Sequence, residues 1–216
     1  MKINICKVLF EDLKLKARYS EKIRGYIGSK YNEFLLLHNH YGTKFIYRYP
    51  KVQYKIIKNV PIIIGIEEAA NLVANIGIFD DELILDKTRY ISFEKKIIMD
   101  NLNLEEKDDY LMYKFMTPWV ALNQSNIRKY RLSNQIEREN MLKNILIGNI
   151  ISLCKGLNYT INKKLDCWIN LKEIDVKLKG IKYKAFMGEF KVNFEIPEYL
   201  GIGKFVSKGF GTIKRK

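Results

Sequence analysis

The sequence predicts an α+β protein made of two similar units in tandem. Segments that alternate apolar and polar residues, as half-buried strands do, recur in both halves of the chain. Between them lie segments with apolar residues at three- and four-residue spacing, which predict amphipathic helices. A polar stretch at 100–109 separates the halves, so we expect an N-terminal domain at 1–100 and a C-terminal domain at 108–216.

The first half predicts the order strand, helix, strand, strand, helix, strand. Ser20 is a suitable N-cap for the first helix, Gly77 a stop for the second, and Pro50 a bend between two extended pieces. The expected strands lie at 2–16, 44–58 (in two pieces), 61–65 and 82–99, and the expected helices at 21–36 and 67–76. This order is that of a ferredoxin-like, or RRM-like, unit.

The second half repeats the order strand, helix, strand, strand. Gly156 ends the longest helical pattern, and Lys179–Gly180 is a two-residue hairpin signal between two long strands. The expected elements are strands at 110–121, 165–178 and 181–196, a helix at 134–155, and a short strand that starts near 206 or 210. A second ferredoxin-like unit follows, and the sequence leaves open whether it keeps its second helix.

Composition favours a polyanionic partner. The chain has 38 Lys and Arg against 24 Asp and Glu, a formal net charge of +14, which is most often a sign of nucleic-acid binding. Its three cysteines are widely spaced and form neither a zinc pattern nor an even-numbered disulfide framework, which favours a reducing compartment. There is no apolar run of membrane-spanning length and no signal-peptide pattern, so we expect a cytoplasmic protein without a membrane partner.

The last sixteen residues combine glycines with lysines and aromatic rings. Glycines let backbone N–H groups approach an anion, lysines neutralise phosphates, and aromatic rings stack on bases. The candidate RNA-binding residues are Gly201, Gly203, Lys204, Lys208, Gly209, Phe210 and Gly211, together with Arg24 on the polar face of the first helix. The plainer interpretations are a glycine-rich turn before a terminal strand and a solvated helix face.

His38 and His40 are the only histidines, and both follow the first predicted helix. In an extended segment, side chains at i and i+2 lie about 7 Å apart on one side, which suits a general acid and a general base on one phosphodiester. Lys44 is a candidate to stabilise the phosphate and Tyr47 to orient or donate a proton. An exposed pair without chemistry and a phosphate-binding pair remain alternatives. No cysteine or third histidine stands nearby, so we expect neither a metal nor another cofactor.

Three stretches together resemble one known family. They are Tyr47–Lys55 (YRYPKVQYK), Thr117–Asn123 (TPWVALN) and the glycine-rich Gly201–Thr212. The chain resembles, essentially from end to end, the CRISPR-associated repeat-processing endoribonucleases of the sixth Cas family, and most closely their "b" branch. The resemblance implies tandem ferredoxin-like domains and metal-independent cleavage of CRISPR repeat RNA by the 2′-OH, which leaves a 2′,3′-cyclic phosphate and a 5′-OH.

In that family a catalytic histidine usually follows the first helix, which matches His38 and His40, and some branches add a tyrosine and a lysine. Tyr31, Tyr47 and Lys44 are candidates for these roles by position. We therefore expect a cytoplasmic prokaryotic enzyme that matures CRISPR RNA, with the glycine-rich segment as its clamp on the RNA backbone. The alternatives are a non-catalytic RNA-binding subunit of a CRISPR effector complex and an unrelated RRM-like module. The sequence leaves open a homodimer on RNA and membership of an effector complex.

Overall fold

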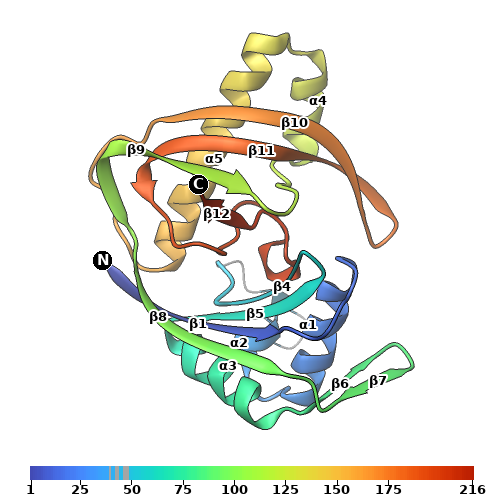
Figure 1. Cartoon of the computed structure of the whole chain (residues 1–216). Helices are drawn as coiled ribbons and strands as arrows, with labels where there is room; N and C mark the ends of the chain where they lie inside the picture. The colour runs from blue at the N-terminus through green and yellow to red at the C-terminus, as the bar shows by residue number, and fades with distance from the viewer. Residues whose placement is uncertain (39, 42–43, 46–48) are drawn as a thin grey trace. The chain divides into compact units, whose positions relative to one another are not determined.

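A computed structural model describes residues 1–38, 40–41, 44–45 and 49–216, with the backbone alone for His38, His40, Tyr41, Lys44 and Phe45. The chain divides into two compact units (Figure 1). The N-terminal unit holds residues 2–102 together with 207–209, and the C-terminal unit holds Met1, 103–206 and 210–216. Among the described residues, no helix is long and apolar enough to cross a membrane.

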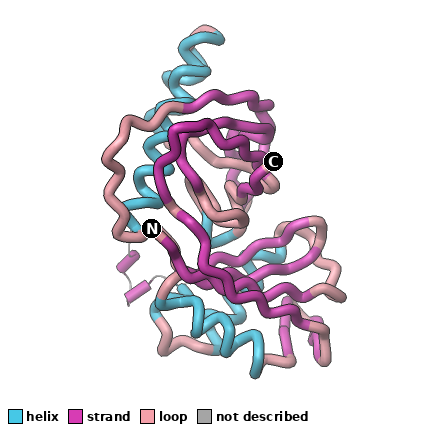
Figure 2. Tube along the Cα trace, turned by 60° about the vertical axis from the view of Figure 1, so that its left-hand side comes forward, coloured by secondary structure: helices cyan, strands magenta, loops and turns pink. Residues whose placement is uncertain are grey.

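The N-terminal unit has the predicted ferredoxin-like topology. Its sheet has the order β4-β5-β1-β8, and β5 runs antiparallel to both of its neighbours. The sheet strands are β1 (Lys2–Phe10), β4 (Val52–Ile57), β5 (Val60–Ile66) and β8 (Lys95–Asn103), the small hairpin strands are β2 (His40–Tyr41), β3 (Lys44–Phe45), β6 (Glu82–Leu85) and β7 (Thr88–Ile91), and the helices are α1 (Tyr19–Lys30), α2 (Leu35–His38) and α3 (Glu68–Phe79). Helices lie on one side of this sheet (Figures 1 and 2).

Apolar spacing explains why α1 and α3 pack on the sheet. Ile23 and Ile27 are four residues apart on α1, Val73 and Ile76 are three apart on α3, and all four join one buried cluster with strand residues such as Val8. Side chains at these spacings share one face of a helix, so each helix presents an apolar stripe to the sheet.

Three details of this unit differ from the sequence prediction. The helix expected at 21–36 ends at Lys30, and a separate short helix, α2, follows it. Ser20 does not cap α1, because its hydroxyl donates to the carbonyls of Ala17 and Lys208. Gly77 lies inside α3, where a Cβ would be 2.7 Å from a methyl carbon of Val8, so this glycine allows close packing rather than ending the helix.

The C-terminal unit repeats the topology with the sheet order β10-β11-β9-β12. Its strands are β9 (Glu105–Phe115), β10 (Cys167–Leu178), β11 (Ile181–Glu195) and β12 (Ile213–Arg215), and its helices are α4 (Gln124–Leu132), α5 (Gln135–Gly156) and the 3₁₀ turn η1 (Val206–Lys208), whose last two residues belong to the N-terminal unit. Between β11 and β12, where all residues are described, η1 is the only helical element, so the second helix of this repeat is reduced to one turn. The tail strand begins at Ile213 instead of near 206 or 210.

Local signals define the longest helix and the hairpin of this unit. Asn134 and Glu137 form a capping box at the start of α5, in which each side chain accepts a hydrogen bond from the other's backbone N–H. Lys179 and Gly180 both have positive φ, 48° and 80°, as a two-residue hairpin turn requires. The helix and the hairpin turn agree with the prediction, whereas the capping box and α4 were not predicted.

Strand β4 is buried on both of its faces. Val52, Tyr54 and Ile56 point into the core beneath the helices, and Gln53 and Lys55 alternate with them and are also fully or almost fully buried. Burial lowers the pKa of Lys55 from its usual value of 10.5 to about 7, because a low-dielectric environment disfavours the ammonium form.

This shift predicts how stability depends on pH. Between pH 7 and pH 10 the unfolded chain keeps the Lys55 proton and the folded chain releases it, so folding grows more favourable as pH rises in this window. The Lys55→Met variant has no side chain that releases a proton at this position. The free energy of unfolding in urea should therefore rise more from pH 7 to pH 9 for the wild type than for this variant. Lys87→Met, at an exposed turn, should follow the wild type. If the free energy of unfolding changed with pH in the same way for the wild type and Lys55→Met, the lowered pKa of Lys55 would be contradicted.

Candidate nucleic-acid interface

The histidine segment is held at both ends by β4. Leu37, the residue before His38, is buried, and its carbonyl accepts a hydrogen bond from the Tyr54 hydroxyl at 3.3 Å. On the other side, the amide of Gln53 donates to the Tyr49 hydroxyl at 2.9 Å and to the Pro50 carbonyl at 3.2 Å. Adjacent residues of one buried strand therefore fix the two ends of the segment that carries both histidines.

The backbone shows that His38 and His40 do not share one extended segment, as the sequence analysis assumed. His38 ends the short helix α2, and His40 opens β2, so the two histidines do not lie in one continuous strand. The β2–β3 hairpin pairs His40 with Phe45 and Tyr41 with Lys44. This register places the backbone of Lys44 opposite Tyr41, the residue after His40, while Tyr47 lies outside the described residues.

Arg24 acts on Tyr54, which is bonded to the start of this segment. Burial raises the pKa of Tyr54, and the positive charge of Arg24 works in the opposite direction. The Tyr54 hydroxyl is bonded to Leu37, the residue next to His38. The predicted RNA-binding residue Arg24 is half-buried and is not on a fully solvated face.

Tyr31 has a structural partner. Its hydroxyl donates to the buried carboxylate of Asp80 at 2.8 Å, and the same carboxylate binds Lys30 at 2.6 Å. Burial, together with the hydrogen bond to Asp80, raises the pKa of Tyr31 to about 12. Tyr31 is therefore poorly suited to give up a proton near neutrality. Within the described parts of the chain, no group of three or more His, Cys, Asp or Glu residues could hold a metal ion.

The glycine-rich segment is built onto the Thr117–Asn123 stretch. Gly211 donates to the Pro118 carbonyl at 2.8 Å, and the Lys204 backbone donates to the Val120 carbonyl at 3.1 Å. Gly203 has a φ of 93°, and a Cβ there would be 2.6 Å from the indole nitrogen of Trp119. Trp119 is itself fully buried. Two motifs that are far apart in sequence thus form one structural unit.

The tip of this segment, Ser207–Gly209, belongs to the N-terminal unit and lies on β4. The Lys208 carbonyl accepts a hydrogen bond from the Ser20 hydroxyl at 2.7 Å. Gly209 has a φ of 89°, and a Cβ there would be 2.9 Å from the Tyr54 carbonyl oxygen. Tyr54 therefore contacts the glycine-rich tip through its backbone and the start of the histidine segment through its hydroxyl.

The predicted RNA-binding residues of the segment have different surroundings. Gly201, Gly209 and Gly211 are buried and serve close packing. Lys208 forms an ion pair with Glu21 at 2.8 Å, and its side chain is only 16% exposed. Lys204 is exposed, and partial desolvation lowers its pKa.

Phe210 packs edge-on against Phe205, with ring centroids 5.9 Å apart, and Phe205 packs in the same way on Tyr183 at 5.1 Å. These rings are thus part of an intramolecular cluster.

Lys204 lines a basic groove of about 420 Å³ in the C-terminal unit. Arg131 of α4 and Lys182 and Lys184 of β11 line the same groove, and Lys184 is paired with Glu173 and Asp175. The groove lies beside the glycine-rich segment and has the excess of cationic side chains that a polyphosphate backbone requires. Lys182, Lys184 and Arg131 were not predicted, because they look like ordinary surface charges in the sequence.

Lys55 was also missed by the sequence analysis. It is fully buried on β4, next to Tyr54, and its Cα would be 3.2 Å from a Cβ on Gly209. A lysine with a pKa near 7 in such a place is a feature typical of functional sites. The one available signal was the alternation of Lys51, Gln53 and Lys55 with apolar residues in a strand that is otherwise hydrophobic.

Comparisons with known proteins identify the family of the chain. The model of the Cas6b N-terminal domain matches residues 1–103, and that of the Cas6b C-terminal domain matches residues 105–216. These matches cover almost the whole chain, and the chain belongs to the Cas6b family. An uncharacterised protein of Methanocaldococcus jannaschii is 45% identical over 109 residues, which are 50% of this chain and 74% of that protein.

Solved structures of Cas6b proteins are also similar to this chain. A crystal structure of a Cas6b is 42% identical with a TM-score of 0.96, and the match covers 100% of both chains. A second, described as a CRISPR RNA processing endoribonuclease Cas6b, is 39% identical with a TM-score of 0.82 and the same coverage. A Cas6-related protein of Pyrococcus furiosus, 12% identical with a TM-score of 0.55 over 100% of this chain and 98% of that chain, shares the tandem ferredoxin-like fold.

The close approach of Gly209 to β4 can be tested by stability. In Gly209→Ala the new methyl group meets the Tyr54 carbonyl, and the backbone has a positive φ that alanine disfavours. Unfolding should therefore cost about 1–3 kcal/mol less than in the wild type. Gly25→Ala is the matched control, because its methyl group meets nothing within 4 Å in α1 and should stabilise by about 0.5–1 kcal/mol. Equal effects of the two substitutions in chemical denaturation would contradict the packing described.

Proposed function

We propose that this protein is an endoribonuclease that cleaves CRISPR precursor RNA within its repeats without a metal ion. The observation that carries the proposal is the arrangement at β4. Gln53 and Tyr54 hold the two ends of the only histidine-containing segment, and the glycine-rich tip lies on the backbone of the same strand. The family membership supports RNA processing, since a 39% identical relative is described as a CRISPR RNA processing endoribonuclease.

The proposed reaction needs two proton transfers. One histidine of the pair His38 and His40 removes the proton from the 2′-OH, whose oxygen attacks the adjacent phosphorus. The other protonates the 5′-oxygen as its bond to phosphorus breaks, so the products carry a 2′,3′-cyclic phosphate and a 5′-OH. Histidine suits both roles because its pKa lies near neutrality. Lys44 stabilises the charge on the phosphate, and Tyr47 orients the reacting groups.

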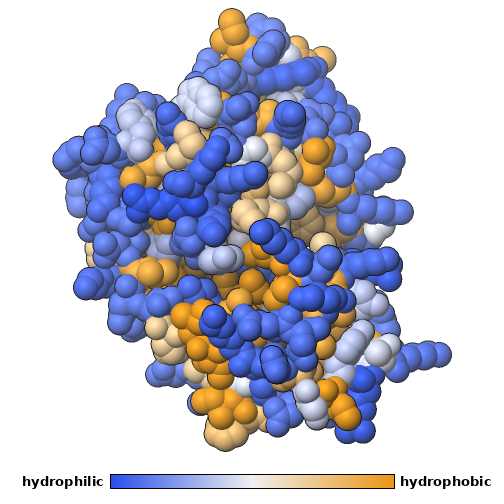
Figure 3. Space-filling model, in the orientation of Figure 1, coloured by the Kyte–Doolittle hydropathy of each residue, from blue (hydrophilic) through white to orange (hydrophobic). Residues whose placement is uncertain are grey.

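The RNA backbone is held mainly by cationic groups. Lys204 and the basic groove beside it supply exposed positive charge in the C-terminal unit. In the N-terminal unit, the half-buried Arg24 adds a positive charge that acts on Tyr54. The buried glycines 201, 209 and 211 act indirectly, by allowing the segment that carries Lys204 to fold closely on its neighbours. The high net charge of +14 suits a polyanionic substrate. The face drawn in Figure 3 is largely hydrophilic.

The mechanism predicts cleavage of CRISPR repeat RNA in the presence of EDTA. A single 2′-deoxy substitution at the cut site should abolish cleavage, because it removes the attacking oxygen. His38→Ala and His40→Ala should each lower the single-turnover rate by about a hundredfold or more. RNA affinity should remain nearly unchanged in both variants, as measured with the 2′-deoxy RNA.

Two results would overturn the proposal. Loss of activity in EDTA with recovery on adding a divalent metal would show metal-dependent chemistry. Tight binding of repeat RNA without any cleavage by the wild type would favour a non-catalytic RNA-binding subunit instead.

A further inference from the structure

The sheet of the C-terminal unit has one buried face and one exposed face. Residues on the buried face lie under α5, whose buried side chains include Leu146 and Ile150. The strand residues on that face are Tyr113, Cys167, Ile169, Phe190 and Val192. Side chains alternate along a strand, so the residues between these point to the opposite face. There Lys114, Trp168 and Lys191 are exposed.

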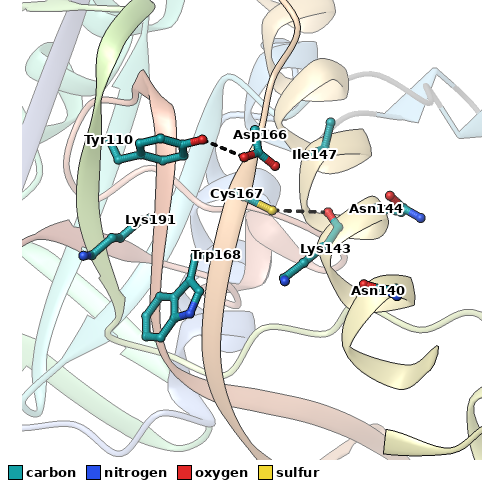
Figure 4. A pocket seen from close by; sticks show the side chains of 9 residues that line it. All are labelled: Tyr110, Asn140, Lys143, Asn144, Ile147, Asp166, Cys167, Trp168 and Lys191. Atoms are coloured by element: carbon teal, nitrogen blue, oxygen red, sulfur yellow. Dashed lines mark hydrogen bonds between the residues drawn. The ribbon is translucent and has the colours of Figure 1, made fainter. Parts of the chain in front are cut away.

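Two aromatic rings stand on the exposed face where β10 begins. Trp168 is 43% exposed and Tyr110 is 50% exposed. Strand register places Trp168 opposite Lys191, and Lys191 opposite Met112, so these three side chains form one row across the face. The Lys191 ammonium lies 5.9 Å from the centroid of the Trp168 ring (Figure 4).

Tyr110 is held in place by a charged partner. Its hydroxyl donates to the Asp166 carboxylate at 2.6 Å, and this hydrogen bond lowers the pKa of Asp166. The Asp166 backbone N–H in turn donates to the Asn193 side chain at 2.8 Å. A ring fixed in this way loses little conformational freedom when a flat ligand stacks on it.

The surroundings are polar, and Lys143 among them forms an ion pair with Glu139 at 2.8 Å. A cavity of about 830 Å³ surrounds the start of β10 and is lined by Tyr110, Trp168 and Lys191 on the sheet side and by Lys143, Asn140 and Asn144 of α5 on the other (Figure 4). Exposed lysines continue along the same face of the sheet, namely Lys114 of β9, Lys172 of β10 and Lys214 of β12. Glu189, in the next row, is neutralised by an ion pair with Lys216 at 2.9 Å.

We propose that this face binds unpaired nucleotides of the RNA, with bases stacked on Trp168 and Tyr110 and phosphates beside Lys191 and Lys114. Exposed aromatic rings among lysines on a four-stranded sheet are the arrangement that binds single-stranded RNA in RRM-type sheets. Of the residues that the structure describes, none lines both this cavity and the basic groove beside the glycine-rich segment. The inference rests on the proposed function only in taking RNA as the ligand.

The two tryptophans of the chain allow a direct test, because Trp119 is fully buried and Trp168 is exposed. The probe is an unstructured single-stranded RNA of mixed sequence, titrated while tryptophan fluorescence is recorded. Stacking on Trp168 should quench the emission of the wild type, and Trp168→Phe should lose this quenching while keeping most of its affinity. Equal quenching in the two proteins, or none in the wild type at saturating RNA, would overturn the proposal.

Affinity gives a second readout. Trp168→Ala should bind the same RNA about tenfold or more weakly, since one stacked base is lost. Lys191→Ala should weaken binding and reduce the slope of log affinity against log salt by about one. Phe79→Ala is the matched control, because Phe79 is a 75% exposed aromatic residue at the end of α3. An equal loss of affinity in Phe79→Ala and Trp168→Ala would contradict a specific site.

Cleavage of CRISPR repeat RNA, measured in parallel, separates this inference from the proposed function. Trp168→Ala should need more RNA than the wild type to reach half of its maximal cleavage rate, whereas Phe79→Ala should cut like the wild type. A protein that cuts repeat RNA without RNA-dependent quenching of Trp168 would refute the inference and leave the proposed function intact. A protein that never cuts, but whose Trp168 is quenched by RNA, would refute the enzyme and leave this binding site intact.

Discussion

The candidate site depends on a single buried strand, β4. Its side chains hold the chain on both sides of the histidine segment, through Tyr54 to Leu37 and through Gln53 to Tyr49 and Pro50. Gly209 packs directly on its backbone, where a Cβ would be only 2.9 Å from the Tyr54 carbonyl oxygen. Both faces of β4 are buried, and a well-packed element of this kind suits the accurate placement that the proposed catalytic groups require. Polar side chains are buried here because they make these hydrogen bonds.

The two halves of the chain use one topology for different purposes. The N-terminal repeat carries the histidines on the segment between its first helices and β4, while the C-terminal repeat replaces its second helix with the glycine-rich segment. That segment has an inner part, which binds the Thr117–Asn123 backbone, and a tip, which belongs to the N-terminal unit. The glycines are therefore needed for packing, and in the proposed function charged contact with RNA falls to residues such as Lys204.

Much of the fold could be predicted because its signals are local. The apolar stripe of α5, its capping box and the Lys179–Gly180 turn each depend on residues close in sequence, and the order of strands and helices then restricts the topology. The helix α4 was missed because its sequence is mostly polar. Gly77 was misinterpreted because its neighbours, Val8 and Ile97, are distant in the chain.

The candidate site was less accessible from the sequence. The histidine pair stood out because the chain has only two histidines. Its attachment to β4 and the burial of Lys55 are tertiary features without a local signature, and so is the ion pair that ties Lys208 to Glu21. In each case the sequence shows the type of the residue, but only the fold shows what surrounds its side chain.

The central claim is that two histidines divide the two proton transfers between them. It is tested most directly with repeat RNA in which sulfur replaces the 5′-oxygen at the cut site, because a thiolate leaves without needing a proton. The account predicts that this RNA restores cleavage in one of the variants His38→Ala and His40→Ala, the one that lacks the general acid, and not in the other. Restoration in neither variant, or to the same extent in both, would contradict it.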